Sequence, residues 1–370
     1  MRKSFLIFVL FYFLFSPVFC LAQQQDPLVT SYEKAVILES QEITRKITEN
    51  DPEFSRGSEG IISAREVNLG ILSGKFKGKK KLLEYSEFVN PANLEIRQGD
   101  KVIVYLQEFS DGNFEVQIHD YYRLPQMIFL VILFVFLIVL IGRGKGLRAA
   151  ISLLISVFLI FKIFIPLALK GINPVWLALT ISSIIAIVTL LIITGFKKKT
   201  LSAILGTIGG VICSVIIAII FGNLFRLNGL SSEEARILSV SFSLNFKGLL
   251  FSGIIIAALG AVMDISMSIA SGISEIKKAQ PEISRRKLVK SGIAMGQDII
   301  GTMANTLIFA YFGASLFILL LFTKFGESYL KFFNFDFFAE EALGAIAGSI
   351  GLILAVPITA FIAGYLESKS

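Results

Sequence analysis

The sequence is poor in the residues that build covalent or metal-based sites. Its 370 residues include two cysteines, one histidine and one tryptophan. Cys20 lies near the start and Cys213 lies inside a long apolar stretch, which excludes a disulfide framework and a cysteine-based zinc site. A single His119 leaves few other options for a transition metal. No nucleotide-binding loop is present. We therefore expect no metal, no cofactor and no enzyme.

What the sequence has in abundance is apolar surface. Hydrophobic residues make up 54% of the chain, 34 residues are Phe, and the mean hydropathy is +0.74. A soluble globular protein of this length would not carry such a load, so the main partner must be a lipid bilayer. The net charge of +7 does not indicate nucleic-acid binding, because the cations lie between apolar stretches and not on a basic domain with interleaved aromatics.

The first 22 residues are typical of a secretory signal peptide. Arg2 and Lys3 precede a short apolar core over residues 5–15, then Pro17 breaks the segment and Ala22 offers a cleavage site. The alternative is an uncleaved anchor helix, which the shortness of the apolar core disfavours.

Residues 23–124 have a mixed, polar composition that predicts a separate β-rich domain. Apolar and polar residues alternate over 94–96, 102–106 and 114–118, which is the pattern of half-buried strands. Gly99 and Asp100 supply turn chemistry between two of these stretches, and Ser73, Gly74 and Gly78 end an earlier apolar stretch over 61–72. A domain of about a hundred residues can bury a modest core.

From residue 125 onward, apolar segments of about the length needed to cross a bilayer follow one another. We place seven spans at about 125–142, 147–169, 174–195, 200–225, 246–274, 292–323 and 342–365. Lysine and arginine gather in alternate connectors, around 143–148, 197–199 and 277–290, which the positive-inside rule assigns to the cytoplasm. The fold class is thus an all-α membrane bundle of about seven helices over residues 125–370. We expect its N-terminal β domain to be extracytoplasmic and its C-terminus to be cytoplasmic.

Two of the predicted spans carry polar side chains at membrane depth. At about 100° per residue, Asp264, Ser268 and Ser271 share one helical face of the fifth span, which continues to Glu275. Asp264 lies eleven residues before Glu275 and hence about 16 Å from the cytoplasmic end. In the sixth span, Asp298, Thr302 and Asn305 share another face.

A carboxylate in the middle of a bilayer costs about 2.5–3.5 kcal/mol on insertion scales, so it requires a partner, a proton or water. We expect the two polar faces to meet, sheltered from lipid, and to form a cation or proton site with the hydroxyl and amide groups as neutral oxygen ligands. The alternative is a polar seam that joins two helices and transports nothing.

Several stretches of the sequence resemble the YibE/F family of bacterial multi-pass membrane proteins. They are Leu72–Gly78, Gln98–Val102, Asp120–Arg123, Gly142–Arg148, Gly260–Glu275, Gly296–Leu307, Gly348–Gly351 and Ala355–Pro357. The resemblance implies a cytoplasmic-membrane protein with an extracytoplasmic domain, and it implies no particular substrate.

The leading functional hypothesis is a secondary transporter or permease for a small solute or ion, with Asp264 and Asp298 in its pathway. The second hypothesis is a membrane scaffold whose outer domain binds a partner protein. The third is an intramembrane aspartyl protease. The sequence disfavours it, because Asp298 follows Gly296-Gln297 and not the Gly-x-Gly that such enzymes carry.

Overall fold

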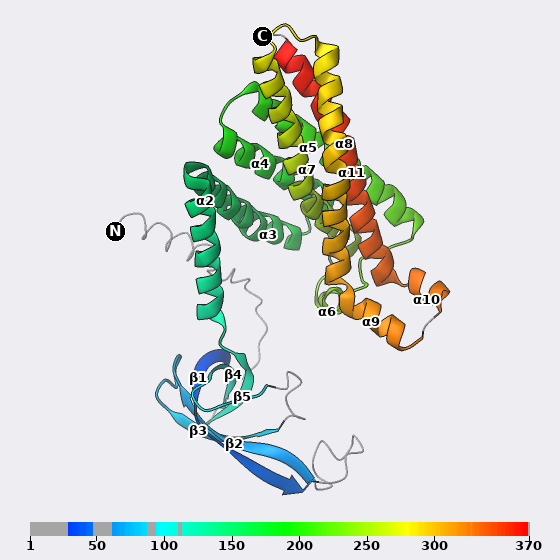
Figure 1. Ribbon diagram of the computed structural model, residues 1–370. Helices are drawn as coiled ribbons and strands as arrows, with labels where there is room; N and C mark the ends of the chain where they lie inside the picture. The colour runs from blue at the N-terminus through cyan, green and yellow to red at the C-terminus, as the bar shows by residue number, and fades with distance from the viewer. Residues whose placement is uncertain (1–28, 47–60, 87–93, 110–112, 327, 369–370) are drawn as a thin grey trace. The chain divides into compact units, whose positions relative to one another are not determined.

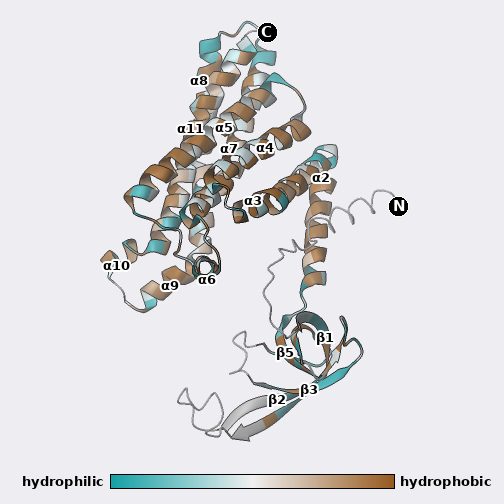
Figure 2. Cartoon of the chain, turned by 180° about the vertical axis from the view of Figure 1, so that it is seen from behind, coloured by the Kyte–Doolittle hydropathy of each residue, from teal (hydrophilic) through white to brown (hydrophobic). Residues whose placement is uncertain are grey.

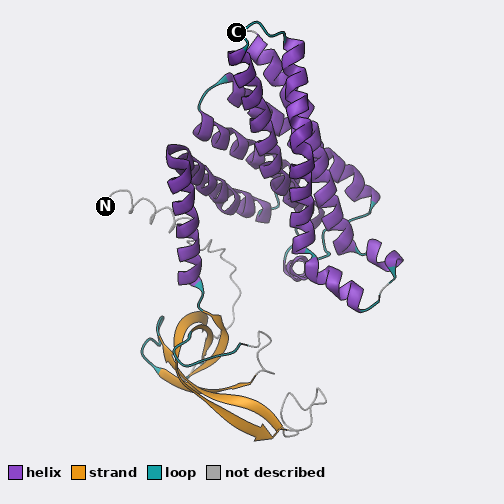
Figure 3. Cartoon of the chain, in the orientation of Figure 1, coloured by secondary structure: helices purple, strands orange, loops and turns teal. Residues whose placement is uncertain are grey.

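A computed structural model describes residues 29–46, 61–86, 94–109, 113–326 and 328–368 of the chain. The predicted signal peptide lies outside the described residues. The chain divides into two compact units, an outer unit over residues 19–136 and a helical unit over 137–370. All the described strands belong to the first unit and precede the first labelled helix (Figures 1 and 3).

The outer unit is a curved antiparallel sheet of five strands in the order β3-β2-β1-β4-β5. Its centre is the long β1, which pairs with β2 on one side and with β4 on the other. Alternate residues of β4, among them Val102, Val104 and Leu106, are buried, as the period of a half-buried strand requires. The strands are β1 (Val29–Lys46), β2 (Ile61–Ile71), β3 (Lys80–Ser86), β4 (Lys101–Glu108) and β5 (Phe114–Tyr121).

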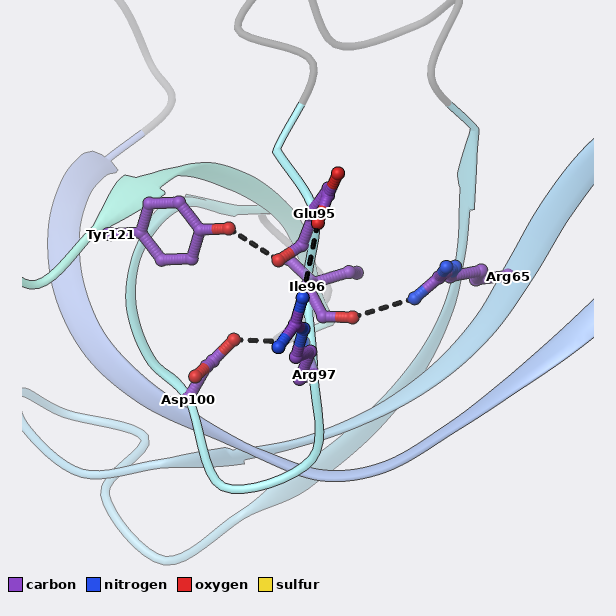
Figure 4. A network of polar contacts seen from close by, with 6 residues as sticks. All are labelled: Arg65, Glu95, Ile96, Arg97, Asp100 and Tyr121. Atoms are coloured by element: carbon purple, nitrogen blue, oxygen red, sulfur yellow. Dashed lines mark hydrogen bonds and ion pairs between the residues drawn. The ribbon is translucent and has the colours of Figure 1, made fainter.

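The predicted strands at 102–106 and 114–118 are confirmed as parts of β4 and β5, but the prediction for 94–96 is wrong. Leu94 and Ile96 are buried, yet side chains and not a neighbouring strand satisfy this backbone. Figure 4 shows the arrangement: Arg65 donates to the Ile96 carbonyl at 2.8 Å and Tyr121 donates to the Glu95 carbonyl. An alternating pattern cannot reveal such partners, because they come from distant elements.

The helical unit consists of long apolar helices joined by short connections. Brown, hydrophobic residues dominate these helices in Figure 2, and teal gathers at their ends. The helices are α2 (Leu124–Leu159), η2 (Ile160–Phe164), α3 (Ile165–Leu169), α4 (Pro174–Thr194), α5 (Lys198–Leu224), α6 (Glu233–Ser241), α7 (Phe246–Ala279), α8 (Arg285–Ala314), α9 (Leu316–Lys324), α10 (Tyr329–Phe333) and α11 (Asp336–Ser368).

The predicted count of seven spans is not confirmed. Within the described residues, five helical runs are long and apolar enough to cross a membrane, or six if α8 and α9 count as one bent span. The first run, Leu124–Leu169, has 46 residues, which is about 69 Å of straight helix and far more than one bilayer. Its backbone breaks at Arg143 (φ 49°, ψ −130°), inside the predicted cytoplasmic connector.

The predicted sixth span at 292–323 is not a straight helix. α8 and α9 meet near Ser315 with a bend of 59°. Ser315 Oγ donates to the Tyr311 carbonyl at 3.0 Å, in the last turn of α8. Residues 316–323 are as apolar as the turns before Ser315. The prediction from composition therefore continued the sixth span across this bend.

Ser231 followed by Glu234 is the pattern of a capping box and predicts a short helix over 232–240. The structure has this helix as α6, but its cap is one residue later. Ser232, not Ser231, accepts the Ala235 amide at 3.2 Å. The Ser231 hydroxyl instead donates to Glu340 at the start of α11, at 2.5 Å. Sequence reasoning could not find this bond, since its partners lie 109 residues apart.

The centre of the helical unit is the junction of α5, α7 and α11. A Cβ added to Gly210 of α5 would lie 2.7 Å from both Val262 of α7 and Ala355 of α11. Such distances are shorter than real carbon contacts, so only glycine fits. The helical spacing of glycines, such as Gly206 and Gly210 in α5 and Gly292 and Gly296 in α8, predicts close helix contact. Such contact is observed here and at Gly296 against Val356.

We predict that Gly210→Val destabilises the helical unit by about 1–3 kcal/mol through overpacking. The matched control is Gly260→Val in α7, where an added Cβ meets nothing within 4 Å in the described structure. Thermal unfolding in detergent should show a lower midpoint for Gly210→Val than for Gly260→Val. Equal midpoints would contradict the three-helix junction.

Candidate functional site

The polar face of α7 lies opposite the face that forms the core. Val262, Ile265 and Ile269 are fully buried between α7 and its neighbours. Asp264 and Ser268 are exposed on the surface of the single chain, and Ser271 is half-buried. A helical period of 3.6 residues enforces this division, because the two sets of residues occupy opposite sides of the helix.

The polar face of α8 is arranged in the same way. Gly292, Gly296 and Leu307 are buried against other helices, and Asp298, Thr302 and Asn305 are exposed. We call the six side chains together the α7–α8 polar face; its members are Asp264, Ser268, Ser271, Asp298, Thr302 and Asn305.

Contacts between glycines and side chains give the register of the two helices. A Cβ on Gly272 would lie 2.5 Å from the Met295 sulfur, and one on Gly292 would lie 2.5 Å from Ile273 Cδ1. Since α7 and α8 are antiparallel, this register places Asp264 at the level of Thr302.

The two halves of the α7–α8 polar face border the same edge of the helix contact. Ser268 lies one turn before Gly272 on α7, and Thr302 lies two turns after Met295 on α8, so each shares a row with a contact residue. The register therefore brings the two halves to the same edge of the α7–α8 contact. Both halves lie on the outer surface of the single chain and not in its interior.

Two hydroxyl groups of this face, those of Ser268 and Thr302, donate hydrogen bonds to backbone carbonyls of their own helices. Ser268 Oγ donates to the Asp264 carbonyl at 2.8 Å, and Thr302 Oγ1 donates to the Ile299 carbonyl at 3.0 Å. These bonds satisfy the hydroxyl protons within each helix, and the oxygens keep lone pairs that point outward. They do not form a seam between α7 and α8.

A real polar contact between helices lies elsewhere and was not predicted. Thr359 of α11 donates to Ser266 of α7 at 3.2 Å, and both residues are fully buried. Among the described residues, the buried oxygens without a hydrogen-bond partner are Ser182 Oγ, Ser214 Oγ and Glu340 Oε1. Serines are frequent in apolar helices, so the sequence gives no signal that distinguishes these from the others.

Comparison with known proteins decides the family. A family model described as YibE/F-like protein matches residues 130–369. The chain belongs to this family. The match contains the whole α7–α8 polar face and most of the stretches that carried the resemblance. The stretches at 72–78, 98–102 and 120–123 precede the matched region. No curated protein and no solved structure matches the chain.

The exposure of the α7–α8 polar face can be tested by cysteine labelling of this YibE/F-like protein. In a background without Cys20 and Cys213, we expect Ser268→Cys to react with N-ethylmaleimide much faster than Ser266→Cys. The reason is that Ser268 is exposed whereas Ser266 is fully buried against Thr359. Mass spectrometry of the detergent-solubilised protein gives the rates. A faster reaction at position 266 would mean that α7 is rotated from the described orientation.

Proposed function

We propose that this YibE/F-like chain is a secondary transporter or permease for a small solute or ion, and that the α7–α8 polar face lines its path. The observation that supports the proposal is the position of Asp264 near mid-span, on a surface that no described part of the helical unit covers. Asp298 and two oxygen-bearing neighbours, Thr302 and Asn305, lie on the adjoining helix.

The cost of burying charge in lipid is the physical reason. An ionised Asp264 facing acyl chains would cost about 2.5–3.5 kcal/mol on insertion scales, and Asp298 would add to that cost. A bundle that placed both groups against lipid would be poorly inserted for no gain. A path that water reaches removes the cost, because the carboxylates are then hydrated.

The chemistry of the face suits a hard cation or a proton. Carboxylate, hydroxyl and amide oxygens are the ligands that such ions prefer, and protonation of a carboxylate allows an ion to be released. Coupling would use an ion gradient, because the sequence contains no loop that could hold a nucleotide.

The experiment is flux into liposomes that contain the purified protein. Dyes inside the liposomes report protons, sodium, potassium and divalent metals in turn. We expect the wild type to carry at least one of these above the protein-free level, and Asp264→Asn to lose that flux, because an amide cannot take up and release a proton. Glu282→Gln is the matched control, since Glu282 is exposed in the connector between α7 and α8.

Two results would overturn the proposal. One is background flux of every tested ion through the wild type. The other is an undiminished flux through Asp264→Asn in protein whose thermal stability matches that of the wild type.

We further propose that the C-terminus is cytoplasmic and the outer unit extracytoplasmic. The support is the distribution of cations: Lys197–Lys199 and the α7–α8 connector, rich in lysine and arginine, alternate with connectors that are richer in acids. A green fluorescent protein fused after Ser370 should fluoresce, and alkaline phosphatase at the same point should be inactive. Active phosphatase would reverse the orientation.

A further inference from the structure

The connection between β2 and β3 carries the densest charge in the outer unit. We call residues 72–81 the lysine hairpin, since five of the seven residues from 75 to 81 are lysines and none of the ten is acidic. Four of the lysines are exposed and the fifth, Lys81, is half-buried. The lysines are Lys75, Lys77, Lys79, Lys80 and Lys81.

The backbone of the lysine hairpin is held by its own hydrogen bonds. The Ile71 amide donates to the Lys79 carbonyl at 3.0 Å, and the Gly78 amide donates to the Ile71 carbonyl at 2.8 Å. Gly78 has a φ of +86°, which side chains other than glycine adopt at a cost. The hairpin is thus formed before any ligand arrives, and little ordering entropy is lost when one binds.

Two aromatic rings support the ammonium groups. Phe76 is buried and stacks on Phe114 of β5, with ring centroids 4.3 Å apart. Lys79 Nζ lies 4.9 Å from the Phe76 centroid, and Lys81 Nζ lies 5.3 Å from the Phe114 centroid. Cation–π attraction keeps these charges on one side of the outer unit.

Most of this charge is not neutralised. Within the described residues, Lys75 pairs with Glu108 of β4, and no acid pairs with Lys77, Lys79, Lys80 or Lys81. Glu115 is near in sequence, but it follows Phe114 and so projects from the opposite face of β5. The Glu33 carboxylate contacts the hairpin too, but it accepts from the Ser73 hydroxyl at 2.6 Å and forms no ion pair with these four lysines in the described part of the chain.

We propose that the lysine hairpin binds a linear, phosphate-rich polyanion. Lysines act as point charges for phosphate, and the hairpin exposes neither the arginine nor the aromatic anchors that protein interfaces favour. Five lysines within seven residues instead match a flexible chain of repeated negative charges. The proposal rests on the outer unit alone and is independent of the proposed transport.

The test uses the full chain in nanodiscs of zwitterionic lipid, with fluorescently labelled inorganic polyphosphate as the probe. We expect K77Q/K79Q/K80Q to bind at least about tenfold more weakly than the wild type at 0.1 M salt. The slope of log affinity against log salt should become shallower by about two, since each lost contact contributes about 0.7–0.9.

Three controls keep the result interpretable. K77R/K79R/K80R retains the charge and should bind like the wild type. K197Q/K198Q/K199Q removes three lysines at the N-terminus of α5 and should leave the affinity for polyphosphate unchanged. Circular dichroism should show equal thermal unfolding for the glutamine and arginine variants.

Several outcomes would overturn the proposal. One is no binding of polyphosphate by the wild type, and another is equal binding by the wild type and K77Q/K79Q/K80Q. An equal loss of affinity in the glutamine and arginine variants would mean that the shape of the lysine side chains, and not their charge, determines binding. Hairpin-dependent binding to phosphatidylglycerol vesicles without binding to polyphosphate would assign the site to a membrane surface instead.

Discussion

The meeting of α5, α7 and α11 at Gly210 determines how the rest of the helical unit is arranged. Because a Cβ at this position would collide with Val262 and Ala355, the three helices approach one another more closely than any larger residue would allow. α7 must then turn its Val262, Ile265 and Ile269 side inward. The opposite side, which carries Asp264 and Ser268, has no position left except the surface.

α8 is placed by the same logic. Gly296 lets it pack on Val356 of α11, and Gly292 lets it pack on Ile273 of α7. With two buried contacts set, the polar side of α8 faces outward beside that of α7. The juxtaposition of Asp264 with Thr302 is therefore a consequence of apolar packing. The glycines that create it lie on the buried sides of the helices, away from the polar groups themselves.

The sequence predicted those features that depend on local pattern. Length and hydropathy located the helical runs, alternation located β4 and β5, and small residues identified the faces in close contact. The sequence-based prediction was wrong where the hydrogen-bond partner is distant in the chain. At residues 94–96, the side chains of Tyr121 and Arg65 bind the backbone in place of a neighbouring strand. At the start of α6, Ser231 binds Glu340 and does not cap the helix. Hydropathy could not reveal the bend near Ser315, because the residues on both sides of it are apolar. The charged stretch over 143–148 did predict an interruption between two apolar segments, and the backbone breaks there, at Arg143.

For the candidate site, the sequence predicted which side chains share one face of a helix but not how exposed that face is in the single chain. Helical periodicity correctly grouped Asp264 with Ser268 and Asp298 with Thr302, since it depends on one helix at a time. Whether a face is buried depends on how all the helices pack. In the single chain, the polar faces of α7 and α8 are exposed and not buried as expected. Gly253 and Gly260 of α7 are also free of contacts with other helices, because an added Cβ at either would meet nothing within 4 Å in the described structure. Intrachain packing therefore does not require glycine at either position, although Gly260 lies only about one turn before Asp264 on α7.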